Sequence, residues 1–136
     1  IAAGGIATPA GVAAARALGA AAVQVGTAYL NCPEATTSAL QRAALAGEAA
    51  RHTALTNLFT GRPARGIVNR IMREIGPLCA AAPAFPLATS AIAPLRAAAE
   101  KLGRSDFTPL WCGQNSLCPN QPAAEITRWL AQGFAA

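Results

Sequence analysis

Two short glycine turns stand near the start of the 136-residue chain, about twenty residues apart. Gly4 and Gly5 follow the apolar run "IAA", and Gly26 closes the apolar run "AAAVQVG". Glycine lacks a Cβ, so its backbone N–H group can approach a ligand closely, and a helix N-terminus just beyond adds a positive dipole. The two turns therefore have the residue types of a phosphate site, although glycines that only form tight turns would give the same pattern.

Other reactive side chains are sparse. His52 stands alone in "RHTALTN", which favours a surface or hydrogen-bonded structural histidine over a metal ligand or a base. The four cysteines, Cys32, Cys79, Cys112 and Cys118, form no CxxC pair, and this spacing disfavours both a zinc site and a disulfide framework. We therefore expect no metal, reduced thiols and a cytoplasmic location.

The net charge of +5 comes from 11 basic and 6 acidic residues, and a basic chain can bind nucleic acid. Only Arg62, Arg65, Arg70 and Arg73 cluster, however, and no aromatic residue lies between them to stack on a base. Solvated or structural arginines are the favoured interpretation. No nucleic-acid partner is expected.

The chain is rich in apolar residues without containing a membrane segment. No apolar run reaches the ~18 residues that a membrane helix needs, and the opening stretch lacks the basic segment of a signal peptide. Hydrophobic residues make up 53% of the chain and charged residues only 12%, against a usual charged share of about 25%. An exposed apolar face or sequence missing from the chain would account for this, and a homo-oligomer is one expectation.

The elements that position the turns form a strand, a helix and a second strand over residues 1–30. Thr8 is a predicted N-cap, Pro9 the first helical residue and Gly19 the C-terminal cap of the intervening helix. Two parallel strands need neighbours and cover on both faces, so we expect several further strands on the N-terminal side. In (β/α)8 barrels the loops after strands seven and eight are the frequent phosphate site.

These observations predict an α/β fold, the C-terminal part of a TIM (β/α)8 barrel with strands 7 and 8 and the helices that follow. A dinucleotide-binding fold is disfavoured, because "GGIATPAG" is not GxGxxG and no acidic residue ends the second strand. Residues 1–136 show no repeat and no charged linker, so a single unit is expected, with residues 31–136 as a mostly helical extension. In it we expect helices at about Ser38–Leu45, around Ile67, Ile71 and Ile75, at about Pro94–Leu102 and from Pro122, an extended piece in "TALTNLF" and a loop over 76–89.

Three segments together resemble a known family. "IAAGGIATPAGVAAARALGAAAVQVGTAYLNCPEA", "LTNLFTGRPARGIVNRI" and "PLWCGQNSLCPNQPAAEITRWL" are similar to the C-terminal part of the bacterial nitronate monooxygenases, formerly called 2-nitropropane dioxygenases. The resemblance runs over nearly the whole chain in the family's order. It implies an FMN-dependent TIM barrel that oxidises alkyl nitronates with O2 and without a metal.

The resemblance also implies site residues. The turns that hold the FMN phosphate in the family fall on Gly4, Gly5, Gln24, Val25, Gly26 and Thr27. A family "LWxGQ" loop near the mouth of the active site places Gln114 beside the substrate. The family's catalytic histidine lies in a "GGH" loop that this sequence does not contain, and His52 does not match it. The catalytic residue is therefore unknown, and this chain alone is expected to be inactive.

The sequence departs from the family pattern at Cys112 and again at Cys118 with Pro119, and two alternatives accompany the resemblance. Cys112 replaces a residue that is usually small, and an inert substitution is favoured over a reactive thiol. Arg62 and Arg65 in "TGRPARG" are assigned structural or surface roles ahead of a substrate role. A flavin-type enoyl-thioester reductase of the same superfamily carries very similar glycine turns and uses NAD(P)H. The second alternative is a non-catalytic truncated product that associates through strand edges and apolar surface.

Overall fold

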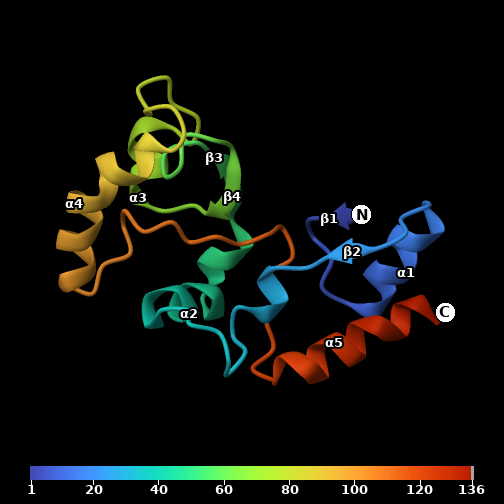
Figure 1. Cartoon of the computed structure of the whole chain (residues 1–136). Coiled ribbons are helices and arrows are strands. Elements are labelled where there is room, and N and C mark those ends of the chain that lie inside the picture. The colour runs from blue at the N-terminus through green and yellow to red at the C-terminus, as the bar shows by residue number, and fades with distance from the viewer. Residues whose placement is uncertain (136) are drawn as a thin grey trace. The chain divides into compact units, whose positions relative to one another are not determined.

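The computed structural model describes residues 1–135, and the contacts within the chain group into two compact units (Figure 1). The first, which we call the turn unit, comprises Ile1–Ser38 and Gly113–Ala136, and the second, the hairpin unit, comprises Ala39–Cys112. The sequence predicts a single unit with a phosphate-binding part that ends near residue 30. In the structure the boundaries between the two groups of contacts lie near residues 38 and 113. The interpretation of residues 1–136 as a single unit stays a prediction.

The turn unit has the strand, helix, parallel strand order expected from the sequence. Strand β1 (Ala2–Ala3) pairs in parallel with β2 (Val23–Gln24), so that Ala2 lies opposite Val23 and Ala3 opposite Gln24. The connection between them contains a helix. The remaining elements are α1 (Pro9–Ala17), the short 3-10 helices η1 (Thr27–Tyr29) and η3 (Gln132–Phe134), and α5 (Ala123–Ala131).

Helix α1 begins and ends where the local sequence predicts. Thr8 is its N-cap, and the Thr8 hydroxyl oxygen accepts a hydrogen bond from the backbone N–H of Gly11 at 3.1 Å. Pro9 is the first helical residue, a position where the missing N–H removes no helical bond. Gly19 has φ +95° just after the helix, and its N–H donates to the Arg16 carbonyl at 2.9 Å. The local sequence alone therefore accounts for both ends of the helix that follows the first glycine turn.

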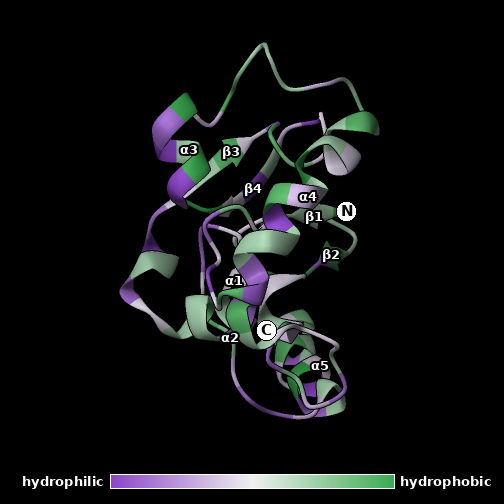
Figure 2. Cartoon of the chain, turned by 90° about the vertical axis from the view of Figure 1, so that its left-hand side faces the viewer, coloured by the Kyte–Doolittle hydropathy of each residue, from purple (hydrophilic) through white to green (hydrophobic). Residues whose placement is uncertain are grey.

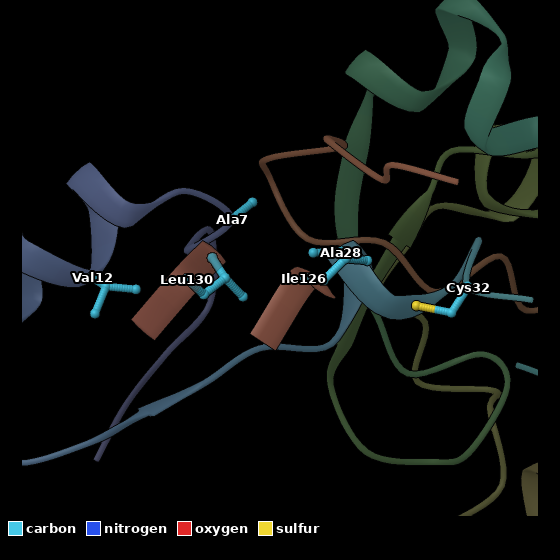
Figure 3. Packing of buried hydrophobic residues seen from close by; sticks show 6 residues of the cluster. All are labelled: Ala7, Val12, Ala28, Cys32, Ile126 and Leu130. Carbon is cyan, nitrogen blue, oxygen red and sulfur yellow. The ribbon is translucent and has the colours of Figure 1, made fainter. Parts of the chain in front are cut away.

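Helix α5 closes the turn unit by packing against α1 and η1. Hydrophobic and hydrophilic bands alternate around α5 (Figure 2), as expected for an amphipathic helix. Its apolar stripe contributes to a core cluster (Figure 3) whose members are Ala7, Val12, Ala28, Cys32, Ile126 and Leu130. Gly133 extends the stripe, and a Cβ built on it would lie 2.2 Å from the Pro9 carbonyl oxygen. Only glycine therefore allows η3 to approach the first turn of α1 this closely.

The hairpin unit contains an antiparallel pair of strands within the region expected to be mostly helical. Thr53 lies opposite Ile67 and Thr56 opposite Ala64. The extended piece expected in "TALTNLF" is confirmed as a strand, but the expectation that Ile67 belongs to a helix is wrong. The elements are α2 (Ala39–Ala46), η2 (Glu48–Arg51), β3 (Thr53–Thr56), β4 (Ala64–Ile67), α3 (Arg70–Ile75) and α4 (Leu87–Lys101).

The chain leaves β4 for α3 because Asn69 caps the new helix. Its side-chain oxygen accepts a hydrogen bond from the backbone N–H of Met72, and its amide nitrogen donates to the Thr108 carbonyl at 2.9 Å. Of the three isoleucines that recur at every fourth position, Ile67 therefore lies in β4, whereas Ile71 and Ile75 lie in α3. Spacing alone does not reveal the cap between them.

Helix α4 begins at Leu87, seven residues before the predicted start at Pro94, which lies inside the helix. Proline inside a helix removes one backbone hydrogen bond and costs about 3 kcal/mol. Tertiary contacts in the first turn offset this cost, because Ala88 is buried and the Thr89 hydroxyl donates to the Phe59 carbonyl at 2.9 Å. The loop predicted over 76–89 therefore ends earlier, at residue 86. Across residues 1–135, no helix combines the length and the apolar character needed to cross a bilayer.

Candidate functional site

The first glycine turn follows β1 directly. Gly4 has φ +98° and Gly5 has φ +72°, a backbone region that side chains with a Cβ rarely adopt. A Cβ built on either residue would meet no atom within 4 Å. The requirement for glycine is therefore one of backbone conformation, and the turn faces open space that a ligand can occupy.

The second glycine turn lies beside the first. Gln24 is paired with Ala3 in the parallel register, so the chain leaves both strands at the same edge of the sheet. Val25 and Gly26 follow, and Thr27 begins η1. A Cβ built on Gly26 would also meet nothing within 4 Å. The parallel pairing thus brings the two sequence-predicted turns together, at the carboxyl ends of the strands, where ligands bind in open α/β sheets.

A third segment, which begins at Gly113, reaches both turns through a contact that the sequence does not predict. The backbone N–H of Gly113 donates to the Thr27 hydroxyl oxygen at 2.9 Å. A Cβ built on Gly113 would lie 3.7 Å from the backbone nitrogen of Gly5. Gln114, the candidate substrate-side residue, is next in the chain and exposed. No local pattern in "LWCGQ" predicts this contact.

Residues 27–34, which follow the second turn, are hydrogen-bonded at three points to residues 113–123, which lead into α5. We call this set of contacts the clasp. The carboxylate of Glu34 accepts from the first residue of α5, a favourable place for negative charge because helix N-termini carry a positive partial charge. The three pairs are Thr27 with Gly113 at 2.9 Å, Asn31 with Cys118 (Nδ2 to the carbonyl oxygen 3.0 Å, N–H to Sγ 3.2 Å) and Glu34 with Ala123 (3.1 Å).

Two of the predicted site residues also line a cavity of about 380 Å³. Gln24 and Val25 line it together with Val23 and with residues of α1, η1, α5 and η3. Val25 therefore borders a largely apolar space, and its proposed contact with a phosphate stays a prediction.

The two arginines of "TGRPARG" have structural partners in the hairpin unit. Arg65 is half-buried and donates from Nη1 to the carbonyl and hydroxyl oxygens of Thr53, both at 3.3 Å. The Arg62 guanidinium lies 4.4 Å from the centre of the Phe85 ring. These contacts across the hairpin and the neighbouring loop account for both side chains and favour the structural roles assigned from the sequence.

The remaining candidates show no constellation for catalysis. Cys112 is only 2% exposed, which favours an inert thiol over a reactive one. His52 is exposed at the end of η2, and its backbone carbonyl accepts from the N–H of Val68 at 2.9 Å. In the part of the chain that the structure describes, no three His, Cys, Asp or Glu side chains gather where a metal ion could bind.

Comparison with known proteins identifies relatives over almost the whole chain. The family model described as nitronate monooxygenase matches residues 1–133. A nitronate monooxygenase of Pseudomonas aeruginosa is 42% identical over 134 residues, and one of Paraburkholderia phytofirmans is 42% identical over 132 residues. Among solved structures, nitroalkane oxidase from Streptomyces ansochromogenes matches with a TM-score of 0.85 and 40% identity, and a mutant of FabK from Thermotoga maritima with 0.66 and 27%.

Each match covers almost all of this chain but much less than half of the matched protein. The alignments cover 97% and 96% of this chain but only 38% and 36% of the two bacterial relatives. The two structural matches each cover 98% of this chain, and 38% and 40% of the solved chains. The chain thus spans somewhat more than a third of the length of the proteins it matches.

Proposed function

This chain belongs to the nitronate monooxygenase family, and from that premise we propose that its two glycine turns bind the phosphate of FMN in an enzyme that oxidises alkyl nitronates with O2. The observation that carries the proposal is the parallel register that places both turns at one edge of the sheet. The residues assigned to the cofactor are Gly4, Gly5, Gln24, Val25, Gly26 and Thr27.

The turns fit a phosphate group in shape and charge. Gly4, Gly5 and Gly26 leave open space where a Cβ would stand, so anion oxygens can reach the backbone N–H groups. Neither "AGGIAT" nor "QVGT" contains an acidic residue that would repel an anion. Thr27 adds a hydroxyl at the start of η1, and a hydroxyl is both a donor and an acceptor.

In the proposed reaction, FMN and the residues of this chain have separate roles. FMN supplies the oxidation chemistry when it is bound. The chain's own residues hold the phosphate and thereby orient the cofactor, and the loop after Gly113 carries Gln114 toward the substrate. We assign no catalytic residue and no metal to this chain, and we expect the chain by itself to be inactive. A cytoplasmic location belongs to the same proposal.

A matched pair of glycine substitutions tests the phosphate site. Gly5 (φ +72°) and Gly103 (φ +70°) have nearly the same backbone conformation, and a Cβ on either meets nothing within 4 Å. Gly5→Ala and Gly103→Ala therefore impose a similar backbone strain of about 1–2 kcal/mol, but only Gly5 lies at the proposed site. We expect Gly5→Ala to raise the Kd for FMN about tenfold or more and Gly103→Ala to leave it unchanged.

The measurement is a fluorescence titration of the complete gene product with FMN. Equal FMN affinity in the two variants would remove the assignment of the turns. A parallel titration with riboflavin, which lacks the phosphate, should show no difference between the variants. If riboflavin binding falls as much as FMN binding, the Gly5 turn supports the fold of the site and not the phosphate.

Two alternatives remain distinguishable by experiment. An enoyl-thioester reductase would be reduced anaerobically by a nicotinamide and not by an alkyl nitronate, and the opposite result supports the proposal. The higher identity and TM-score of the nitroalkane oxidase match, 40% and 0.85, support the nitronate assignment. A non-catalytic, self-associating product would elute from size-exclusion chromatography as an assembly without bound flavin.

A further inference from the structure

Thr27 stands between the second glycine turn and the Gln114 loop, which we define as residues 113–118. Its hydroxyl oxygen accepts the N–H of Gly113 at 2.9 Å, and this is its only side-chain hydrogen bond among residues 1–135. A hydroxyl has one proton to donate as well as lone pairs that accept. Because the Gly113 contact uses a lone pair, the Thr27 proton is left for a ligand at the turns.

We propose that Thr27 is a positioning residue whose hydroxyl couples phosphate occupancy of the glycine turns to the placement of the Gln114 loop. The ligand in this inference rests on the proposed function. When Thr27 donates its proton to an anion, its oxygen becomes a better acceptor, because hydrogen bonds in a chain polarise one another. The bond from the Gly113 N–H is then strengthened. Coupling of this kind is reciprocal, so an ordered loop also favours anion binding.

The rest of the clasp determines which part of the loop responds. Asn31 holds Cys118 through two hydrogen bonds that do not involve Thr27. The far end of the Gln114 loop is therefore tethered whether or not a ligand is bound. The near end, with Gly113 and Gln114, carries the hydrogen bond to the Thr27 hydroxyl. A change at Thr27 should consequently move the residue proposed to face the substrate while α5 stays in place.

Local packing explains why the contact is direct. A Cβ built on Gly113 would lie 3.4 Å from the Thr27 hydroxyl oxygen and 3.7 Å from the Gly5 backbone nitrogen. A Cβ at residue 113 would thus meet both turns at ordinary van der Waals distances, which places the Gly113 backbone beside them. An anion that orders the Thr27 hydroxyl therefore acts on the atom to which the near end of the loop is hydrogen-bonded.

Amide hydrogen exchange in the complete gene product tests this inference. The peptide that contains the Gly113 amide is followed by mass spectrometry without ligand, with inorganic phosphate, with FMN and with riboflavin. The variants are Thr27→Val, which keeps the shape but lacks the hydroxyl, and Thr27→Ser, which retains it. Tyr29→Phe is the matched control, because it removes a hydroxyl from the same segment that instead bonds Thr127 on α5 at 2.8 Å.

In the wild type, Thr27→Ser and Tyr29→Phe, we expect phosphate and FMN to slow exchange at Gly113 about fivefold or more, the lower range of typical coupling. Riboflavin should not slow it. In Thr27→Val, exchange should be faster without ligand and should not respond to phosphate or FMN. Thr27→Ala provides the same comparison if the valine variant does not fold.

The outcomes separate this inference from the proposed function. If FMN binds the wild type but leaves Gly113 exchange unchanged, the coupling is overturned and the phosphate site stands. If Thr27→Val responds to FMN as the wild type does, the hydroxyl is not the link. If neither FMN nor phosphate binds the wild type, both the inference and the proposed function fail.

Discussion

Substituting Gly133 by alanine should be among the most damaging small changes in the turn unit. Gly133 is buried in η3, and a Cβ there would lie 2.2 Å from the Pro9 carbonyl oxygen, 2.7 Å from the Val12 Cβ and 3.0 Å from the Pro9 carbonyl carbon. The Gly133 φ angle is one that other residues adopt, so the whole penalty is steric. Two of the three close atoms belong to the backbone of α1 and cannot rotate away.

The size of the effect follows from these distances. Real Cβ contacts essentially never fall below 3.0 Å, so η3 must withdraw from α1 by about 1 Å. That shift also disturbs the contact of the Arg16 guanidinium with the Phe134 carbonyl. Overpacking of this kind costs about 1–3 kcal/mol, and the rigid neighbours put Gly133→Ala near the upper end. The displaced first turn of α1 lies a few residues after Gly5, so FMN affinity should fall as well.

Urea denaturation of the complete gene product, followed by circular dichroism, measures the free energy of unfolding. Gly11→Ala is the matched control, because Gly11 lies in α1 and its nearest neighbour to a new Cβ is the Thr8 hydroxyl oxygen at an ordinary 3.5 Å. Alanine is the better helix former, so we expect Gly11→Ala to stabilise by about 0.5 kcal/mol. Opposite signs for the two variants are the expected result. A Gly133→Ala protein as stable as the wild type would refute the packing of η3 on α1.

Two further predictions concern the hairpin unit, and urea denaturation measures both. The hydrogen bond from Arg96 at 2.8 Å and that from Thr108 at 2.9 Å lower the pKa of Glu100, against the opposing effect of burial. Glu100→Gln should therefore lower the free energy of unfolding by about 1 kcal/mol at pH 7. This loss should shrink below the pKa of about 4.3 that the carboxyl has in the unfolded chain, and disappear once the pH falls through its lower pKa in the folded protein. A loss of stability that does not depend on pH would contradict this. Asn69→Ala should lower the free energy of unfolding by about 2 kcal/mol, because it removes the cap of α3 and leaves the Thr108 carbonyl without this buried donor. Unchanged stability would show that neither hydrogen bond matters.

The features that could be predicted from the sequence depend on neighbouring residues. Thr8, Pro9 and Gly19 specify the ends of α1 because capping and left-handed backbone are decided within one turn of helix. The apolar stripe of α5 is also readable, since Ile126 and Leu130 recur at helical spacing and both are buried. The same local logic indicated glycine turns after two short strands.

Local reasoning was wrong where distant contacts decide between two allowed structures. Ile67 has the spacing of a helix with the isoleucines that follow, but it lies in β4, where its N–H donates to the Leu110 carbonyl at 2.8 Å. Pro94 has the character of a helix start, but α4 begins at Leu87 because the Thr89 hydroxyl in its first turn donates to the Phe59 carbonyl. In both cases a partner far along the chain outweighs the intrinsic preference.

The sequence by itself determined which residues of this protein can form the phosphate turns, because the freedom of glycine and the caps of a helix are properties of a few adjacent residues. Only the tertiary structure decided that the Gly113 N–H meets the Thr27 hydroxyl across 86 positions of the chain. No local pattern encodes that pairing. It arises when α5 packs its apolar face on α1 and η1, which carries the preceding loop to the turns.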